Sequence, residues 1–148
     1  QLGYDCIGAM MKLFDKDILP PEQRCCSLDN TEDAQAVARK LNMPFHVFHS
    51  QEDFAEKVIH HFIRSYEAGL TPNPCIQCNR HLKFSYFLDA ALELGYEYIA
   101  TGHYARAKDG FLYKGMPSND QSYMLCRLTR QQVSRLLLPL GESSHKKS

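Results

Sequence analysis

The sequence predicts an α/β fold in which a parallel sheet carries helices on both faces. Short apolar runs at residues 4–11, 45–48 and 98–101 are typical of buried strands. Longer segments with apolar residues at helical spacing separate them. This alternation of strand and helix is the pattern of a parallel sheet. In such folds ligands gather beyond the carboxyl ends of the strands, here near Met11, Phe48 and Gly102.

The first apolar run follows a glycine and predicts a strand over residues 4–11. Residues 15–30 are loop-like. A helix then begins at Asn30 or Thr31 and ends near Asn42, because Pro44 forbids its continuation. The next strand is expected over residues 45–48.

Ser50 can cap the next helix, whose apolar stripe runs from Phe54 to Tyr66 and which Gly69 ends. Residues 70–78 hold two prolines and predict a loop, followed by a helix over 82–92. After the strand at 98–101, a hairpin is expected with strands at 104–106 and 111–113 and its turn at Asp109-Gly110. Residues 121–126 and 129–137 fit helices. We therefore predict a partial α/β domain over 1–106 and the start of an added module over 107–148.

Length, charge and cysteine content limit the classes of protein to which the chain can belong. The chain has 148 residues, which suits one core, and no apolar run approaches the roughly 20 residues of a membrane helix. The first 74 residues hold 7 Lys/Arg and 11 Asp/Glu, whereas residues 75–148 hold 10 and 6, a mild hint of an anionic partner for the second half. The six cysteines are spread through a helix-rich sequence, which favours a reduced, cytoplasmic setting over a disulfide scaffold.

The stretch around Cys75 and Cys78 is the most informative. Pro72 and Pro74 stiffen the loop and force Asn73 toward an extended geometry. This loop is expected to deliver Cys78 to the start of a helix, where the helix dipole, together with Arg80 and Lys83, favours the thiolate. The thiolate is the form of cysteine that acts as a nucleophile or as a carrier of sulfur. A CxxC pair can equally be a redox pair, half of a metal site or two ordinary cysteines, and spacing assigns no metal ligand set.

Three further segments are candidates for binding. Gly102 follows a strand and lets a ligand approach the backbone, and Met11 ends another strand where it could lie against an adenine ring. His103 fits either a phosphate contact or an ordinary strand-end histidine. The run Asn119-Asp120-Gln121 is either a helix cap or a polar patch that touches substrate.

In combination these segments resemble the tRNA-specific 2-thiouridylase family, MnmA, from about Gly3 to Glu142. The matching stretches are the Gly-x-Thr-Pro-Asn-Pro-x-x-x-Cys-Asn loop, Leu82-Lys83-Phe84, residues 98–106 and Asp120-Gln121-Ser122-Tyr123. The resemblance implies a cytoplasmic PP-loop enzyme with a Rossmann-like, ATP-pyrophosphatase-type fold that thiolates the wobble uridine of tRNA. ATP, with Mg²⁺, adenylates the uridine, and a cysteine persulfide loaded by a sulfur-relay donor protein then displaces AMP.

The resemblance also implies roles for individual residues. Cys78 matches the first catalytic cysteine. The loop that meets the target base corresponds to Asn73, Pro74 and Cys75, and the ATP-contacting positions correspond to Met11 and Gly102. The tRNA-contacting stretch corresponds to Asn119, Asp120 and Gln121.

Departures from the family pattern add two expectations. The phosphate-binding loop should precede Gln1 and a second catalytic cysteine should follow Glu142, so the chain is expected to be an inactive fragment of the parent enzyme. Cys75 stands where the family often has Asp. An iron–sulfur cluster or other metal held by Cys75 and Cys78 is therefore an alternative. A further alternative is that the chain belongs to another tRNA thiolase or ATP-pyrophosphatase of the same fold.

Overall fold

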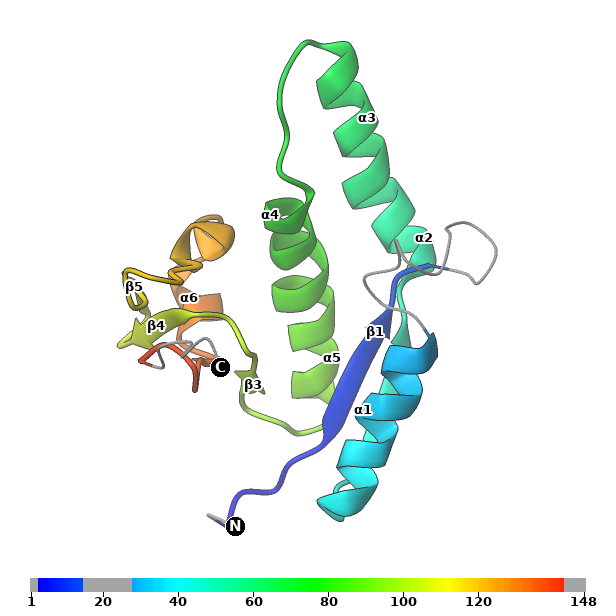
Figure 1. Cartoon of the computed structure of the whole chain (residues 1–148), viewed down its shortest axis with the longest axis vertical. Helices are drawn as coiled ribbons and strands as arrows, with labels where there is room; N and C mark the ends of the chain where they lie inside the picture. The colour runs from blue at the N-terminus through cyan, green and yellow to red at the C-terminus, as the bar shows by residue number, and fades with distance from the viewer. Residues whose placement is uncertain (1–2, 15–27, 143–148) are drawn as a thin grey trace. The chain divides into compact units, whose positions relative to one another are not determined.

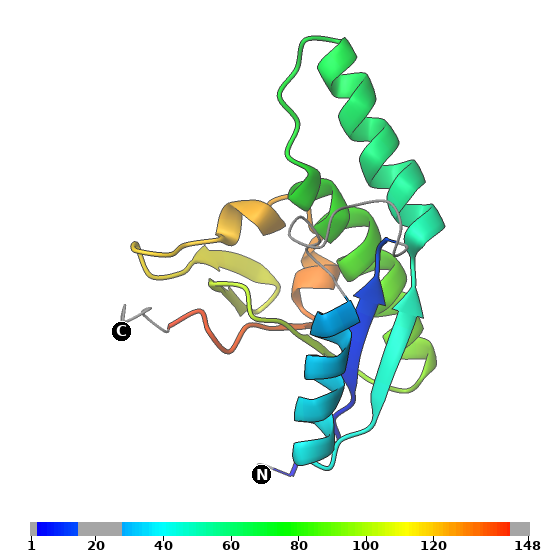
Figure 2. The same ribbon diagram turned by 45° about the vertical axis from the view of Figure 1, so that its right-hand side comes forward.

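The computed structural model describes residues 3–14 and 28–142, and the chain divides into two compact units, 1–55 and 56–148. In the first unit, β1 (Gly8–Lys12) pairs in parallel with β2 (Phe45–His49), and Gly8 lies opposite Phe45 (Figures 1 and 2). Helix α1 (Leu28–Lys40) joins the two strands and packs against β1. Parallel strands need such a crossover, so the predicted strand–helix–strand order is confirmed here.

The predicted end of α1 is also confirmed. Asn42 adopts a left-handed conformation with a φ of 52°. The N–H of Leu41 still bonds the carbonyl of Val37, and the N–H of Met43 bonds the carbonyl of Ala38. These bonds satisfy the last carbonyls of the helix before Pro44 directs the chain into β2.

Ser50 occupies the N-cap position of α2 (Gln51–Phe54), as predicted, but its hydroxyl makes no capping hydrogen bond. Instead its backbone N–H bonds the carbonyl of Lys12 at 3.0 Å, which ties the carboxyl ends of β1 and β2 together. The helix continues as a π-helical segment, η2 (Ala55–Ile59), and as α3 (His60–Glu67). Gly69, with a φ of 73°, terminates it as predicted.

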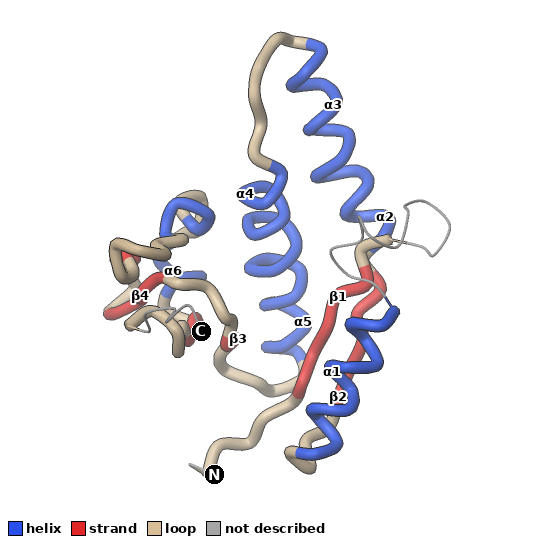
Figure 3. Tube along the Cα trace, in the orientation of Figure 1, coloured by secondary structure: helices blue, strands red, loops and turns tan. Residues whose placement is uncertain are grey.

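In the second unit, residues 74–93 form one uninterrupted helix made of α4 (Pro74–Cys78), the π-helical segment η3 (Asn79–Tyr86) and α5 (Phe87–Glu93) (Figure 3). A π-helix bonds residue i to residue i+5, so residues five apart share a face. Asn79 and Phe84 have this spacing and are both fully buried, and Leu88 follows four residues later at α-helical spacing.

The remaining strands form two pairs. β3 (Ile99–Ala100) pairs in parallel with β6 (Leu136–Leu137), and β4 (Ala105–Lys108) pairs antiparallel with β5 (Phe111–Lys114). Between β5 and β6 lie the 3₁₀-helix η4 (Ser122–Leu125) and α6 (Arg130–Val133). The predicted hairpin is confirmed, and its turn has positive φ at both Asp109 and Gly110, as two-residue hairpin turns favour.

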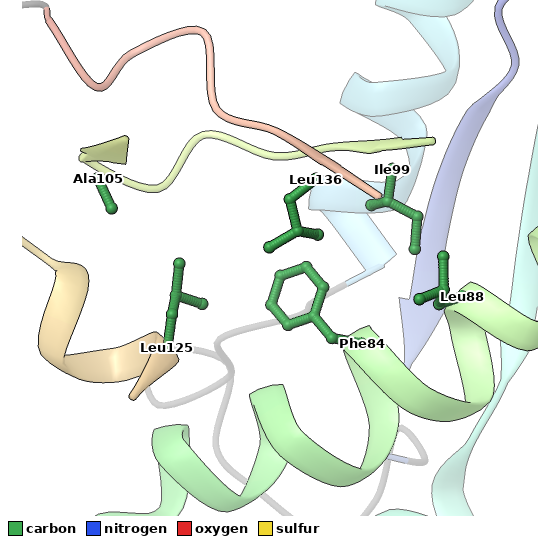
Figure 4. Close-up of a cluster of buried hydrophobic side chains, with 6 residues drawn as sticks. All are labelled: Phe84, Leu88, Ile99, Ala105, Leu125 and Leu136. Carbon is green, nitrogen blue, oxygen red and sulfur yellow. The ribbon is translucent and has the colours of Figure 1, made fainter. Parts of the chain in front are cut away.

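A single cluster of apolar side chains joins these elements (Figure 4). Phe84 and Leu88 enter it from the long helix, and Ile99 and Leu136 enter it from the β3–β6 pair. Ala105 and Leu125 close the side nearest the hairpin. The cluster therefore fixes η3 against η4 and against β3, the strand that precedes Gly102.

Several predicted boundaries were wrong. Helix α1 begins at Leu28, so the predicted caps Asn30 and Thr31 lie inside it. β1 begins at Gly8, and residues 4–7 are not in a strand. The loop predicted over 70–78 ends at Asn73, because proline fits the first turn of a helix and Asn73 caps it. The helix predicted over 129–137 stops at Val133, since Leu136 is buried opposite Ile99 as a strand residue. The domain boundary predicted at 106/107 falls within β4 and stays a prediction.

Candidate functional site

The CxxC segment begins with a capped helix. The Asn73 side-chain oxygen accepts hydrogen bonds from the backbone N–H of Cys75 at 3.0 Å and of Ile76 at 3.4 Å. Pro74 occupies the first turn, where its missing N–H costs nothing. Asn73 and Pro74, predicted to meet a target base, thus also have a local role in starting α4.

The two cysteines of this segment differ in exposure. Cys75 is exposed in the first turn of α4, whereas Cys78 ends α4 and is only 7% exposed. The prediction that a loop presents Cys78 at a helix start is therefore wrong in its local geometry. The helix begins four residues earlier, at Pro74, and its second turn carries Cys78 against the interior.

Hydrogen bonds on either side of Cys78 join its helix to two other segments. The Gln77 side-chain nitrogen lies 3.4 Å from Nε2 of His61 on α3. The amide nitrogen of Asn79 donates to the carbonyl of Met124 in η4 at 3.0 Å. Asn79 is 2% exposed, and its side-chain oxygen has no partner among the described residues. This asparagine was missed by sequence reasoning, because its hydrogen-bond partner lies 45 residues away in the sequence.

The predicted tRNA-contacting run forms a compact polar loop. One carboxylate oxygen of Asp120 accepts from the backbone N–H of Gly115 at 2.7 Å and of Ser122 at 3.1 Å, and the other accepts from the Ser122 hydroxyl. Burial raises the pKa of Asp120, but these hydrogen bonds and the charge of Lys114 outweigh it and hold the pKa below its usual value. Asp120 is therefore a carboxylate near neutral pH.

Gln121 connects that loop to the segment after β3. Its backbone N–H bonds the carbonyl of Tyr104 at 2.8 Å, and its side-chain oxygen accepts from the N–H of Tyr104 at 3.1 Å. Asn119 is partly buried, and its N–H bonds the carbonyl of Met116. The structure thus brings Asn119, Asp120 and Gln121 into one loop that borders both the β3 end and η4.

Gly102 and His103 follow β3. Gly102 is exposed, and a Cβ built there would meet only Leu140 at an ordinary 3.6 Å, so space is open beside its backbone. His103 Nδ1 lies 2.8 Å from the Thr101 hydroxyl, and its ring packs at a tilt on Phe84. Burial, reinforced by the charge of Lys83, lowers the pKa of His103. The ring is therefore neutral near pH 7, with one nitrogen that donates a hydrogen bond and one that accepts.

Met11 belongs to the first unit, in β1, and is 9% exposed. Its side chain thus contributes to the small core of that unit, and the predicted adenine contact stays a prediction. Cys25 and Cys26 lie outside the described residues. Within residues 3–14 and 28–142, no group of three or more His, Cys, Asp or Glu side chains is placed to hold a metal ion. In the same described ranges no helix is both long and apolar enough to cross a bilayer.

Comparison with known proteins places the chain in a family. A family model described as the tRNA methyl transferase HUP domain matches residues 1–148. The tRNA-specific 2-thiouridylase MnmA of Clostridioides difficile (strain 630) is 46% identical, over 96% of this chain and 42% of the relative. The same-named protein of Clostridium botulinum (strain Eklund 17B) is 45% identical over 95% of this chain and 41% of the relative. MnmA 2 of Clostridium tetani is 42% identical over 99% of this chain and 42% of the relative.

The chain thus spans about two fifths of the length of the curated relatives that it matches. The predicted α/β class is confirmed by the family and by the parallel pairing of β1 with β2 and of β3 with β6. On the match of the whole chain, this protein belongs to the family of the tRNA methyl transferase HUP domain.

Proposed function

We propose that the chain is part of an enzyme that replaces the 2-oxygen of the tRNA wobble uridine with sulfur, and that Cys78 takes part in the sulfur transfer. The relatives at 42–46% identity are named for 2-thiouridylation. The observation that carries the proposal is the Asn79–Met124 hydrogen bond. It connects the helix of Cys78 with the 3₁₀-helix that directly follows Asn119, Asp120 and Gln121, the run proposed to contact tRNA.

The chemistry needs two steps. The uridine 2-oxygen is a poor leaving group, so ATP, with Mg²⁺, is proposed as the substrate that adenylates it and releases pyrophosphate. The terminal sulfur of a cysteine persulfide, loaded by a sulfur-relay protein, then attacks C2, and AMP leaves with the oxygen. The thiolate of a second cysteine, proposed to be Cys78, attacks the remaining S–S bond. This attack leaves the sulfur on the uridine and a disulfide on the enzyme, which an external thiol reduces. Gly102 offers open backbone beside which a nucleotide can lie, and Met11 is proposed to contact the adenine. The cytoplasm is the proposed location.

The burial of Cys78 adds a condition to this scheme. A sulfur only 7% exposed has to be uncovered when the target base enters. Cys75, exposed one helical turn earlier, is proposed to line the path of the base together with Asn73 and Pro74. Substrate-driven completion of a site is a common means of keeping water from a reactive group.

The decisive test uses the full-length protein that carries this chain, assayed on unmodified tRNA with a sulfur donor. Cys78→Ser should lower 2-thiouridine formation by at least about 10³-fold, the loss expected when a covalent catalyst is removed. Cys6→Ser, at an exposed cysteine with no proposed role, is the matched control and should keep the activity. Mass spectrometry of the digested nucleosides separates a thiolated from a methylated uridine. Methylated product, or unchanged thiolation in Cys78→Ser, would refute the proposal.

The CxxC pair itself suggests a second candidate, an iron–sulfur cluster or metal module. Two thiols one helical turn apart supply only half of a four-ligand set, and the described residues supply no third ligand beside them. Anaerobic purification of the full-length protein followed by metal analysis distinguishes this candidate. Stoichiometric iron or zinc that is lost in Cys75→Ser would favour it over simple thiol chemistry.

A further inference from the structure

The two cysteines of the CxxC segment lie in one closed helical turn. Cys75 and Cys78 are three residues apart in α4, and the backbone N–H of Asn79 bonds the carbonyl of Cys75 across the turn that holds them both. Residues at this spacing in an α-helix share a face, and their Cα atoms are about 5 Å apart. That separation lies within the range of about 4.4–6.8 Å that a disulfide can bridge.

Solvent has access to only one of these two residues. Cys75 is exposed, whereas Cys78 is 7% exposed. The reaction proposed above ends with Cys78 in a disulfide with the persulfide-carrying cysteine of the full-length enzyme, which we call the carrier cysteine. The rate of thiol–disulfide exchange depends on access to the sulfur that is attacked. A reducing protein in solution therefore has poor access to Cys78 and ready access to Cys75.

We propose that Cys75 is the thiol that releases Cys78 after each sulfur transfer. This inference rests on the proposed function, because it takes the disulfide of Cys78 as the end point of one turnover. The thiolate of Cys75 attacks Sγ of Cys78, the bond to the carrier cysteine breaks, and the carrier cysteine leaves as a thiolate. A disulfide between Cys75 and Cys78 results, and the number of disulfides on the enzyme is unchanged.

An external dithiol protein of the thioredoxin class completes the cycle. One of its thiolates attacks the exposed sulfur of Cys75, which releases Cys78, and its second thiol then displaces Cys75. The dithiol protein is oxidised to a disulfide and supplies the two electrons and two protons that restore both cysteines of the CxxC segment. The exposed cysteine thus passes reducing equivalents from solvent to the buried one.

Helix geometry favours rapid reduction of the Cys75–Cys78 disulfide. Side chains three residues apart on a helix have Cβ atoms about 5–6 Å apart. A relaxed disulfide needs a Cβ separation of about 3.5–4.5 Å, so the first turn of α4 must tighten when the bond forms. Strained and exposed disulfides are the ones that are reduced most readily. The bond is therefore a transient intermediate and not a structural crosslink.

Cys126 is the other exposed cysteine in the described part of the second unit. It lies at the end of η4, two residues after Met124, whose carbonyl accepts the hydrogen bond from Asn79. Because Cys126 belongs to a different element, helix geometry does not hold it at bonding distance from Cys78. It therefore supplies the matched control for the role of Cys75.

The test follows the disulfides of the full-length protein through one turnover. Enzyme preloaded with persulfide is mixed with ATP and unmodified tRNA without reductant, free thiols are alkylated, and mass spectrometry of unreduced peptides identifies the partner of Cys78. The unsubstituted protein and Cys126→Ser should both contain the Cys75–Cys78 disulfide. In Cys75→Ser, Cys78 should stay bonded to the carrier cysteine, and added thioredoxin should release it at least about tenfold more slowly than in the unsubstituted protein.

The unsubstituted protein alone can overturn the proposal, if after turnover its Cys78 is bonded to the carrier cysteine and no Cys75–Cys78 disulfide is present. Equal rates of release in Cys75→Ser and the unsubstituted protein, or slow release in Cys126→Ser as well, would also overturn it. Digested nucleosides from the same samples report 2-thiouridine. Thiolated product without the Cys75–Cys78 disulfide would refute this inference and leave the proposed function standing. Absence of thiolated product would refute the proposed function, and the inference with it.

Discussion

His103 links the end of β3 to the stability of the second unit. Its ring is held by the Thr101 hydroxyl and by Phe84, and burial, with Lys83 adding to it, lowers its pKa. In the unfolded chain the pKa returns to about 6.5. At pH values between these two pKa values, His103 is protonated in the unfolded state and neutral in the native state. The contribution of neutral His103 to the free energy of unfolding is therefore fully present above pH 6.5, and it is lost as the pH falls below this value.

We predict that His103→Gln makes the free energy of unfolding less dependent on pH between about 7.5 and 5.5. Urea titrations at a series of pH values measure this slope. The substitution also removes the hydrogen bond to Thr101, so the whole curve should lie lower, but only the slope tests the prediction. Parallel curves for the two proteins would show that His103 does not titrate in this window.

At the scale of single elements, the turn of the β4–β5 hairpin packs closely against the side chain of Arg130. Gly110 has a φ of 75°, and a Cβ there would lie 2.7 Å from Cγ of Arg130. The Arg130 guanidinium lies 4.5 Å from the centre of the Phe111 ring, and its nitrogen donates to the carbonyl of Asp109 at 3.4 Å. The turn therefore needs both the backbone freedom and the small size of glycine.

Gly110→Ala should cost about 2–4 kcal/mol, which combines left-handed strain of about 1 kcal/mol with overpacking of about 1–3 kcal/mol. Gly95→Ala is the matched control. Gly95 also has a positive φ, 87°, but nothing lies within 4 Å of its added Cβ, so only the strain of about 1 kcal/mol applies. Chemical denaturation of both variants measures the difference. A cost for Gly110→Ala no larger than that for Gly95→Ala would contradict the packing argument.

Elements that depend on a local signal were predictable from the sequence. Asn42, Gly69 and the Asp109-Gly110 turn each specify a backbone conformation without help from distant residues. β6 was missed because apolar residues at 133, 136 and 137 also fit a helix, and only pairing with Ile99 selects the strand. Dependence on residues distant in sequence also limited what could be predicted about the candidate site. Cys78 was selected as a candidate from its motif and stays a prediction, and its burial depends on packing from segments remote in sequence. The hydrogen bond of Asn79 likewise depends on Met124, 45 residues away.

At the scale of the whole chain, the two units differ in how much apolar surface they bury. Among the residues of unit 1–55 that the structure describes, four apolar ones are buried: Met11, Leu13, Ala38 and Phe54. Unit 56–148 holds the cluster around Phe84 and Leu88 as well as Val58, Leu82 and Val133. Its stability should therefore be the greater, because burial of apolar surface is the main favourable term in folding. In its described part the sheet of the first unit consists of β1 and β2, and a two-stranded sheet is marginally stable without further cover.

Native-state hydrogen exchange should consequently show β1 and β2 amides exchanging at least about tenfold faster than amides at residues 84–88. Peptide-level mass spectrometry under conditions where opening is fast and reversible measures both regions in one sample. The hairpin β4–β5 provides an internal reference, since it belongs to the better-packed unit. Equal protection of β1 and the long helix would mean that the chain opens as a single cooperative body.

The π-helical segment η3 constrains how the length of this region can vary. An α-helix turns by about 100° for each residue and the wider π-helix by somewhat less, so deleting one residue between Asn79 and Tyr86 would rotate the far half of the helix around its axis. Leu88 would leave the apolar cluster, or Asn79 would leave Met124, because both could no longer face inward at once. Homologous chains that share this arrangement should therefore differ here by substitution, as at exposed Tyr86, and not by a gap in the alignment.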